Sequence, residues 1–144
     1  MGARRQIDEV LARYMRATDQ RDGVAQAALF APGGAIQVWS RSSDGEYVAA
    51  APEFRAEDIA AVVAKVIGPH APGSFSHHVT MDHLITVAGR EAHLSAQFIV
   101  YEVRPAPEPP VRPSESGYYE MDLVLTEDGW RIARSDVMMD LPAS

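Results

Sequence analysis

His77 and Asp19 are the residues of this sequence whose side chains could move a proton together. His77 lies in the stretch Ser74 to Val87, which holds three of the five histidines, and histidine gains and loses its proton near neutral pH. Asp19 lies near the end of the first predicted helix. A carboxylate that holds one imidazole nitrogen leaves the other free to remove a proton next to a carbonyl group, or β to a leaving group.

The stretch 74–87 alternates in character like a β-strand. One predicted face is mostly apolar and carries His77, Val79, Met81, His83, Ile85 and Val87; the other carries His78, Thr80, Asp82, Leu84 and Thr86. An apolar face normally points into a core, so we place His77 at the wall of an internal cavity. Taken without a partner, the stretch favours the alternative, a sheet-edge histidine that only hydrogen-bonds a loop.

The partner is predicted to come from the start of the chain. Apolar residues recur at helical spacing up to about Thr18–Gln20, which puts Asp19 at a helix C-terminus, where the helix dipole disfavours a carboxylate. Asp22 suits the N-cap of a second, short helix at 24–30, which frees Asp19 for another use; a second capping group is the alternative. Tyr14 could donate a proton to a departing hydroxyl, or could simply be a core residue of the same helix.

Composition limits the class of function. A chain of 144 residues predicts one domain, 1–144, with room for a core and a pocket. A net charge of −7 without a basic run argues against nucleic acid and anionic membranes as partners. The sequence has no cysteine and no apolar run of membrane-spanning length, so we expect a cytoplasmic protein.

The predicted order of elements indicates an α+β fold. Strands are expected at 35–40, 46–50, 91–103, 117–125 and 130–139, and a third helix at 56–67 with Ile59, Val62, Val63, Val66 and Ile67 buried. Residues 104–116 contain five prolines and predict an exposed connector within a hairpin. We therefore expect a curved antiparallel sheet wrapped around N-terminal helices, forming a cone with an internal pocket.

The other polar and aromatic residues refine this prediction. Strand alternation would separate His78 and Asp82 from His77 and His83, so no metal site is predicted. Aromatic and long side chains could line an apolar, substrate-binding cavity, although filling the core is the default for each. These candidates are Phe30, Trp39, Phe54, His83, Tyr101, Tyr119 and Met121.

Several short motifs occur together in this order. They are Ile7-x-x-Val10-Leu11-x-x-Tyr14-x-x-x-x-Asp19-x-x-Asp22, Leu29-Phe30-Ala31-Pro32-Gly33, Ser76-His77, Val87-x-Gly89-x-x-Ala92, Gly117-x-Tyr119 and Asp128-Gly129-Trp130-Arg131-Ile132. Over nearly the whole chain this pattern resembles the SnoaL-like branch of the nuclear-transport-factor-2-like superfamily, which includes polyketide cyclases, scytalone dehydratase and bile-acid dehydratases. The resemblance implies a small apolar molecule inside the cone, proton transfer without a metal or organic cofactor, Asp19 orienting His77, and Tyr14 as a possible acid.

The resemblance leaves more than one function open, because the fold also hosts proteins without chemistry. The first hypothesis is a cofactor-independent lyase or isomerase of the dehydratase or cyclase type. The second is a non-catalytic ligand-binding or regulatory protein, and the third is an assembly subunit like the small subunit of ring-hydroxylating dioxygenases. Related proteins commonly pair through the broad face of the sheet, so a homodimer is expected.

Overall fold

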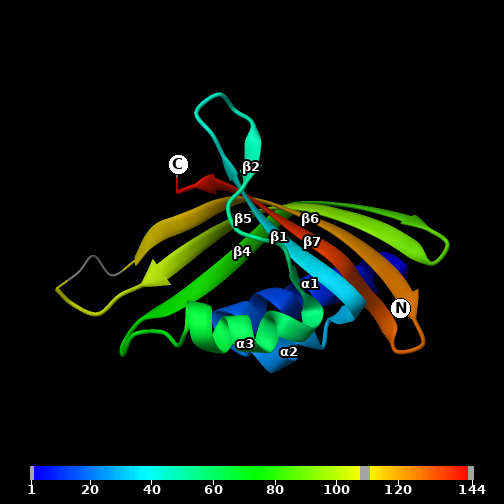
Figure 1. Ribbon diagram of the computed structural model, residues 1–144, viewed down its shortest axis with the longest axis horizontal. Coiled ribbons are helices and arrows are strands. Elements are labelled where there is room, and N and C mark those ends of the chain that lie inside the picture. The colour runs from blue at the N-terminus through cyan, green and yellow to red at the C-terminus, as the bar shows by residue number, and fades with distance from the viewer. Residues whose placement is uncertain (1, 108–110, 143–144) are drawn as a thin grey trace.

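A curved sheet forms one layer of the molecule, and all the helices lie on its concave side (Figure 1). The computed structural model describes residues 2–107 and 111–142. The helices are α1 (Ala3–Asp19), α2 (Gly23–Ala27) and α3 (Ile59–Val62), the last flanked by a 3-10 turn, η1 (Ala56–Asp58), and a π turn, η2 (Val63–Ile67). The strands are β1 (Phe30–Arg41), β2 (Tyr47–Ala49), β3 (Phe54–Arg55), β4 (Phe75–Ala88), β5 (Glu91–Val103), β6 (Val111–Thr126) and β7 (Gly129–Leu141).

The strand order in the sheet is β2-β1-β7-β6-β5-β4, with β3 paired to β1 beside this path. This arrangement confirms the predicted α+β cone, with one difference. β1 and β7 run parallel, whereas the other neighbouring pairs are antiparallel. Parallel strands need a long crossover connection, and here everything between β1 and β7 serves as that connection.

Helix α1 packs its apolar stripe against the concave side of the sheet. Ile7, Leu11, Tyr14 and Met15 are all at most 4% exposed and belong to the same hydrophobic core as residues of β5, β6 and β7. The predicted end of this helix, at about Thr18–Gln20, is confirmed, since the helix ends at Asp19. Asp22 caps α2 as expected, since its Oδ1 accepts the backbone N–H of Ala25 at 2.9 Å. Among the described helices, none has the length and apolar character needed to cross a membrane.

Strand β4 contains a bulge that overturns the predicted alternation. Its pairing with β5 shifts by one residue between Met81 and Leu84, and Asp82 has a φ of +54°. Before the bulge the inward positions are even-numbered, with Ser76 buried and His77 exposed; after it they are odd-numbered, with Ile85 buried. An extra residue in one strand moves every later side chain to the other face. The apolar residues Ile85 and Val87, which follow the bulge, therefore share a face with His78 and not with His77.

Two further expectations about elements need correction. Residues 111–116 are not connector but the start of β6, where Pro113 pairs with Tyr101. Pairing of β6 with β7 begins only at Ser116, so Pro113 lies where β6 has one neighbouring strand, the kind of position at which a sheet tolerates proline. The connector prediction for residues 108–110 lies outside the described residues.

The helical segment 56–67 is confirmed, but its buried stripe is not. Ile59 and Val63 are buried, whereas Val66 is 78% and Ile67 is 48% exposed. The segment changes from an α turn to a π turn at Val63. A π turn takes up more residues than an α turn, so residues after it lose the phase that the α-helical spacing predicts.

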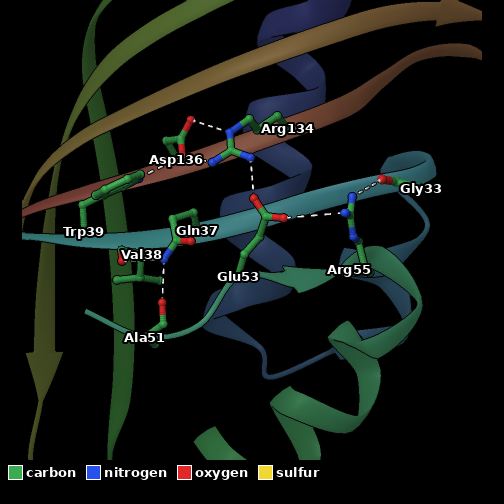
Figure 2. Close-up of polar contacts among 9 residues, drawn as sticks. All are labelled: Gly33, Gln37, Val38, Trp39, Ala51, Glu53, Arg55, Arg134 and Asp136. Atoms are coloured by element: carbon green, nitrogen blue, oxygen red, sulfur yellow. Dashed lines mark hydrogen bonds and ion pairs between the residues drawn. The ribbon is translucent and has the colours of Figure 1, made fainter. Parts of the chain in front are cut away.

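A polar network on the outer side of β1 and β7 fixes the segment before η1 (Figure 2). Arg134 bonds Asp136 twice, at 3.0 and 2.9 Å, and Glu53 at 2.5 Å. Arg55 reaches Glu53 at 3.7 Å and the carbonyl of Gly33 at 3.2 Å. Phe54, between the two charged residues, lines the cavity described below.

Candidate functional site

Asp19 and His78 form a carboxylate–imidazole pair between the end of α1 and the start of β4. His78 Nδ1 lies 2.6 Å from Asp19 Oδ1, and the His78 side chain is 7% exposed. The carboxylate fixes the tautomer, because an ionised Asp only accepts hydrogen bonds and Nδ1 must then carry the proton. Nε2 is left as the basic nitrogen, and it has no hydrogen-bond partner among the described residues.

Three other groups hold Asp19 in place. The backbone N–H of His78 donates to both carboxylate oxygens, at 3.1 and 2.9 Å, and the Ser76 hydroxyl donates to Oδ1 at 2.9 Å. The Asp19 backbone carbonyl lies 2.7 Å from His70 Nε2. Burial alone would raise the pKa of Asp19, but the hydrogen bonds and charge of His78 and the bond from Ser76 lower it below its ordinary value. These contacts are the compensation that a carboxylate at a helix C-terminus requires.

A cavity of about 570 Å³ lies between the helices and the sheet, and His78 lines it. Its apolar wall includes Ile36, Val38, Phe54, Val100, Val137 and Met139, and its polar lining includes Tyr14, Thr18, Arg21, Gln26, His70, Ser76, Glu102, Arg104 and Glu115. Asp19 is not part of the lining. The imidazole, and not the carboxylate, is therefore the group of the pair that a ligand would meet.

Aromatic rings connect His78 to Tyr14 across the interior. The rings of His78 and Phe98 stack with centroids 6.4 Å apart, Phe98 meets Tyr119 at 4.5 Å, and Tyr119 meets Tyr14 edge-on at 5.9 Å. Both tyrosines line the cavity and are 3% exposed. Burial raises the pKa of Tyr14, and raises the pKa of Tyr119 well above its ordinary value. Both hydroxyls therefore keep their protons at neutral pH and can act as donors.

Two buried polar side chains lie close to the Tyr14 hydroxyl. The nearby side chains of Ser135 and Gln26 lower the Tyr14 pKa and so offset part of the rise that burial causes. Ser135 Oγ and Gln26 Oε1 are nevertheless buried without a hydrogen-bond partner among the described residues. A buried polar group without a partner costs about 1–3 kcal/mol. The polar groups around Tyr14 thus have fewer hydrogen-bond partners than those around Asp19.

The structure corrects the predicted position of the histidine. His77 is exposed on the outer face of β4, where it pairs with Tyr101 of β5. The prediction of a hydrogen bond between Asp19 and His77 is therefore wrong, and His78 takes that place. The physical reason is the bulge at Asp82, because an unbroken alternation assigns His77 to the face of Ile85.

The other predicted cavity residues divide into four groups. Phe54 and Tyr119 line the cavity, while Phe30 and Met121 are buried in the core. Trp39 and Tyr101 follow directly after the cavity residues Val38 and Val100, so they point to the other face of the sheet. Trp39 there donates to Asp136 at 2.9 Å (Figure 2). His83 lies outside the cavity lining and contacts Asp8 at 2.9 Å and Thr80 at 3.1 Å.

Sequence reasoning missed several polar residues of the site, among them Arg21, Gln26, His70 and Ser76. Ser76 could have been found from its spacing, because it shares a strand face with His78. The remaining three come from loops and from a five-residue helix, where no periodic pattern exists. Within the described ranges, no three His, Asp or Glu side chains are grouped as a metal site would require.

Comparison with known proteins places this geometry in a family. The family profile of the SnoaL-like domain matches residues 1–136, and no curated protein sequence matches the chain significantly. ActVI-ORFA from Streptomyces coelicolor superposes with a TM-score of 0.77 at 19% identity, covering 97% of this chain and 98% of that one. A candidate β subunit of an aromatic-ring-hydroxylating dioxygenase from Novosphingobium aromaticivorans gives 0.77 at 21% identity, covering 96% and 89%.

A third similar structure carries a ligand. It is a protein from Catenulispora acidiphila solved in complex with S-DNPA, with a TM-score of 0.71 at 16% identity over 94% of this chain and 92% of that one. Identities this low show a shared fold, and the family profile extends the match to the sequence. The chain belongs to the SnoaL-like family.

Proposed function

We propose that this protein is a cofactor-independent lyase or isomerase of the dehydratase or cyclase type, acting on a small, apolar, cyclic molecule. The observation that carries the proposal is the Asp19–His78 pair, in which a buried imidazole lines the cavity with Nε2 free. His78 is the proposed general base, and Asp19 is the residue that orients it.

The proposed reaction begins with proton removal at a carbon next to a carbonyl group. The C–H electron pair moves into the carbonyl group to form an enolate, and the proton goes to His78 Nε2. Asp19 stabilises the resulting imidazolium, as the third member of a catalytic triad does. The imidazolium then returns the proton, either to a leaving hydroxyl, which departs as water, or to another carbon of the substrate.

Tyr14 is the proposed acid that assists at the substrate oxygen. It lines the same cavity as His78, and burial keeps its hydroxyl protonated. A donor placed at a developing oxyanion in a site with little water contributes more than it would in solution. Tyr119 shares the burial and the raised pKa, so it is a second donor in reach of the cavity.

The comparisons support this class of reaction at the level of the family. The SnoaL-like domain and the likeness to ActVI-ORFA are compatible with polyketide-type ring substrates. The neighbour solved with S-DNPA is an example of the fold with a small organic ligand. A cavity of about 570 Å³ with an apolar wall has the size of an ordinary small-molecule site.

A ligand-binding protein without catalysis is the second candidate, and one observation favours it. Asp19 accepts hydrogen bonds from the backbone of β4 and from Ser76 as well as from the imidazole. The pair could therefore serve only to attach β4 to the end of α1.

We further propose a homodimer formed through the outer face of the sheet. The helices cover the other face (Figure 1), and Val79 and Leu84 of β4 are 45% and 71% exposed.

Exchange of α-protons tests the catalytic proposal without knowledge of the natural substrate. 2-Tetralone, an apolar bicyclic ketone, is incubated with the protein in D₂O, and the loss of its α-proton signals is followed by NMR. We expect wild type to accelerate the exchange and His78→Gln to lower the rate by roughly 10²–10⁴-fold, the usual contribution of a general base. Asp19→Asn should lower it by orders of magnitude, and Tyr14→Phe by roughly 10²-fold or less.

His77→Gln is the matched control, because it removes the adjacent histidine from the outer face. This variant should exchange α-protons as fast as wild type. If 2-tetralone and a panel of β-hydroxy ketones bind but none is turned over or exchanged, the binding-protein reading replaces the catalytic one. Full activity in His78→Gln would refute the mechanism.

A further inference from the structure

Arg21 occupies a backbone position that favours glycine. It follows the last turn of α1 with a φ of +57°, and its N–H bonds the carbonyl of Thr18 at 3.2 Å while the N–H of Asp22 bonds that of Ala17 at 2.9 Å. This pair of bonds is a Schellman motif, in which the left-handed residue is usually glycine. A residue with a side chain is strained there. The backbone thus gives no reason for arginine at this place.

The side chain of Arg21 lines the cavity without a counter-ion. Its Nε is buried without a hydrogen-bond partner, and none of the ion pairs within residues 2–107 and 111–142 includes Arg21. Arg104, the other arginine of the lining, does have an ion pair, because it bonds Glu102 at 2.7 Å; Glu102 also lies 3.5 Å from Arg112. Arg21 is therefore the cavity cation whose charge the described part of the protein leaves unmatched.

We propose that Arg21 binds a carboxylate of the ligand, so that the substrate is an apolar ring compound bearing an acid group. This inference rests on the proposed function, because it uses the same cavity. Arginine suits the role, since its planar guanidinium donates two parallel hydrogen bonds to a carboxylate. Glu115 also lines the cavity without a partner among the described residues and repels the acid group, which favours the orientation with the carboxylate at Arg21.

Two ligands of the same shape test the inference. 2-Naphthoate carries a carboxylate, and 2-naphthamide has a neutral amide in its place; calorimetry gives the Kd of each. We expect wild type to prefer the acid, and Arg21→Gly to lower this preference by about 10–100-fold, the range for hydrogen bonds to a charged group. Arg21→Gly should also unfold at the same or a higher denaturant concentration, because glycine suits the left-handed position. A purely structural arginine would not lose ligand preference while keeping stability.

Two variants serve as controls. Glu115→Gln should keep or raise the preference for the acid, and Arg21→Lys should retain part of it. A preference that changes less than twofold in Arg21→Gly would refute the role of Arg21 and leave the proposed function standing if 2-tetralone exchange persists. If neither naphthalene ligand binds at millimolar concentration and exchange is also absent, the cavity is not the ligand site and both proposals fail.

Discussion

At the scale of single residues, Asp19 uses the same two oxygens for structure and for the proposed chemistry. Its carboxylate receives the backbone N–H of His78 and the Ser76 hydroxyl as well as the imidazole. The backbone bonds place the imidazole, and the bond to Nδ1 fixes its tautomer. A substitution at Asp19 therefore disturbs both, which makes His78 the cleaner position for testing catalysis.

His93 provides a pH-dependent contribution to stability on the outer face of the sheet. Its Nδ1 lies 2.9 Å from Asp122 and its Nε2 lies 2.8 Å from Glu120. Both nitrogens can donate at the same time only when the imidazole is charged. Partial burial opposes the charge, but the bonds and charges of Asp122 and Glu120 raise the pKa of His93 above its ordinary value. The stabilisation is therefore complete below the unfolded-state pKa of about 6.5 and is lost as the pH rises through the higher folded-state pKa.

The variant His93→Gln should show this pH dependence directly. At pH 6 it should lower the free energy of unfolding by up to about 1 kcal/mol, the scale of exposed ion pairs, and at pH 9 the difference from wild type should vanish. Urea denaturation at both pH values and one protein concentration measures it. His77→Gln, which removes an exposed histidine that meets no carboxylate among the described residues, is the control. A deficit that grows with pH would contradict the assignment.

The candidate site could be predicted in part at this scale. Asp19 was identifiable, because a carboxylate at a helix C-terminus needs a compensating group and Asp22 already provides the cap. The partner was misassigned by one residue, since His77 and His78 are neighbours and only the strand's phase distinguishes them. Arg21 gave no signal, because its left-handed backbone and its place in the cavity lining follow from the tertiary structure.

At the scale of elements, the bulge in β4 decides which histidine faces inward. The end of α1 and the extents of β4 and β5 followed from periodicity, and the structure confirms them to within a residue. The bulge shifts the phase of the alternation by one residue, but both phases of this stretch carry polar and apolar residues, so the shift is not visible in the sequence. Asp82, at φ +54° with its Oδ2 accepting from Gln97 at 3.0 Å, is a residue type that tolerates this conformation.

Substitution of Asp82 tests the importance of the bulge. Asp82→Val places a β-branched residue in the left-handed region, where it should lower the free energy of unfolding by about 1–3 kcal/mol. Asp82→Gly, the matched control, removes the side chain but suits the conformation, and should differ from wild type by no more than about 0.5 kcal/mol. Chemical denaturation measures both. Equal stability of the two variants would show that the positive φ at Asp82 is not required for the fold.

At the scale of the whole molecule, the order of elements predicted the cone because helices followed by long strands have few ways to pack. The parallel pairing of β1 with β7 was not predictable from local pattern, since the two strands are separated by most of the chain. That pairing brings Val38 of β1 and Val137 and Met139 of β7 to one wall of the cavity. The cavity is therefore a product of topology, and a local reading of the sequence identified only part of its lining.

The proposed homodimer is the remaining prediction at this scale. Light scattering at micromolar concentration should give twice the chain mass of 15.7 kDa. The interface of this dimer should bury more than about 1,000 Å² in total. Val79→Glu places a charge on the outer face of β4 and should shift the mass toward the monomer, because burying an unpaired carboxylate is costly. Val24→Glu makes the same change on α2, where Val24 is 73% exposed, and should leave the dimer intact. A wild-type monomer would refute the dimer, and dissociation by Val24→Glu alone would move the interface from the sheet to the helices.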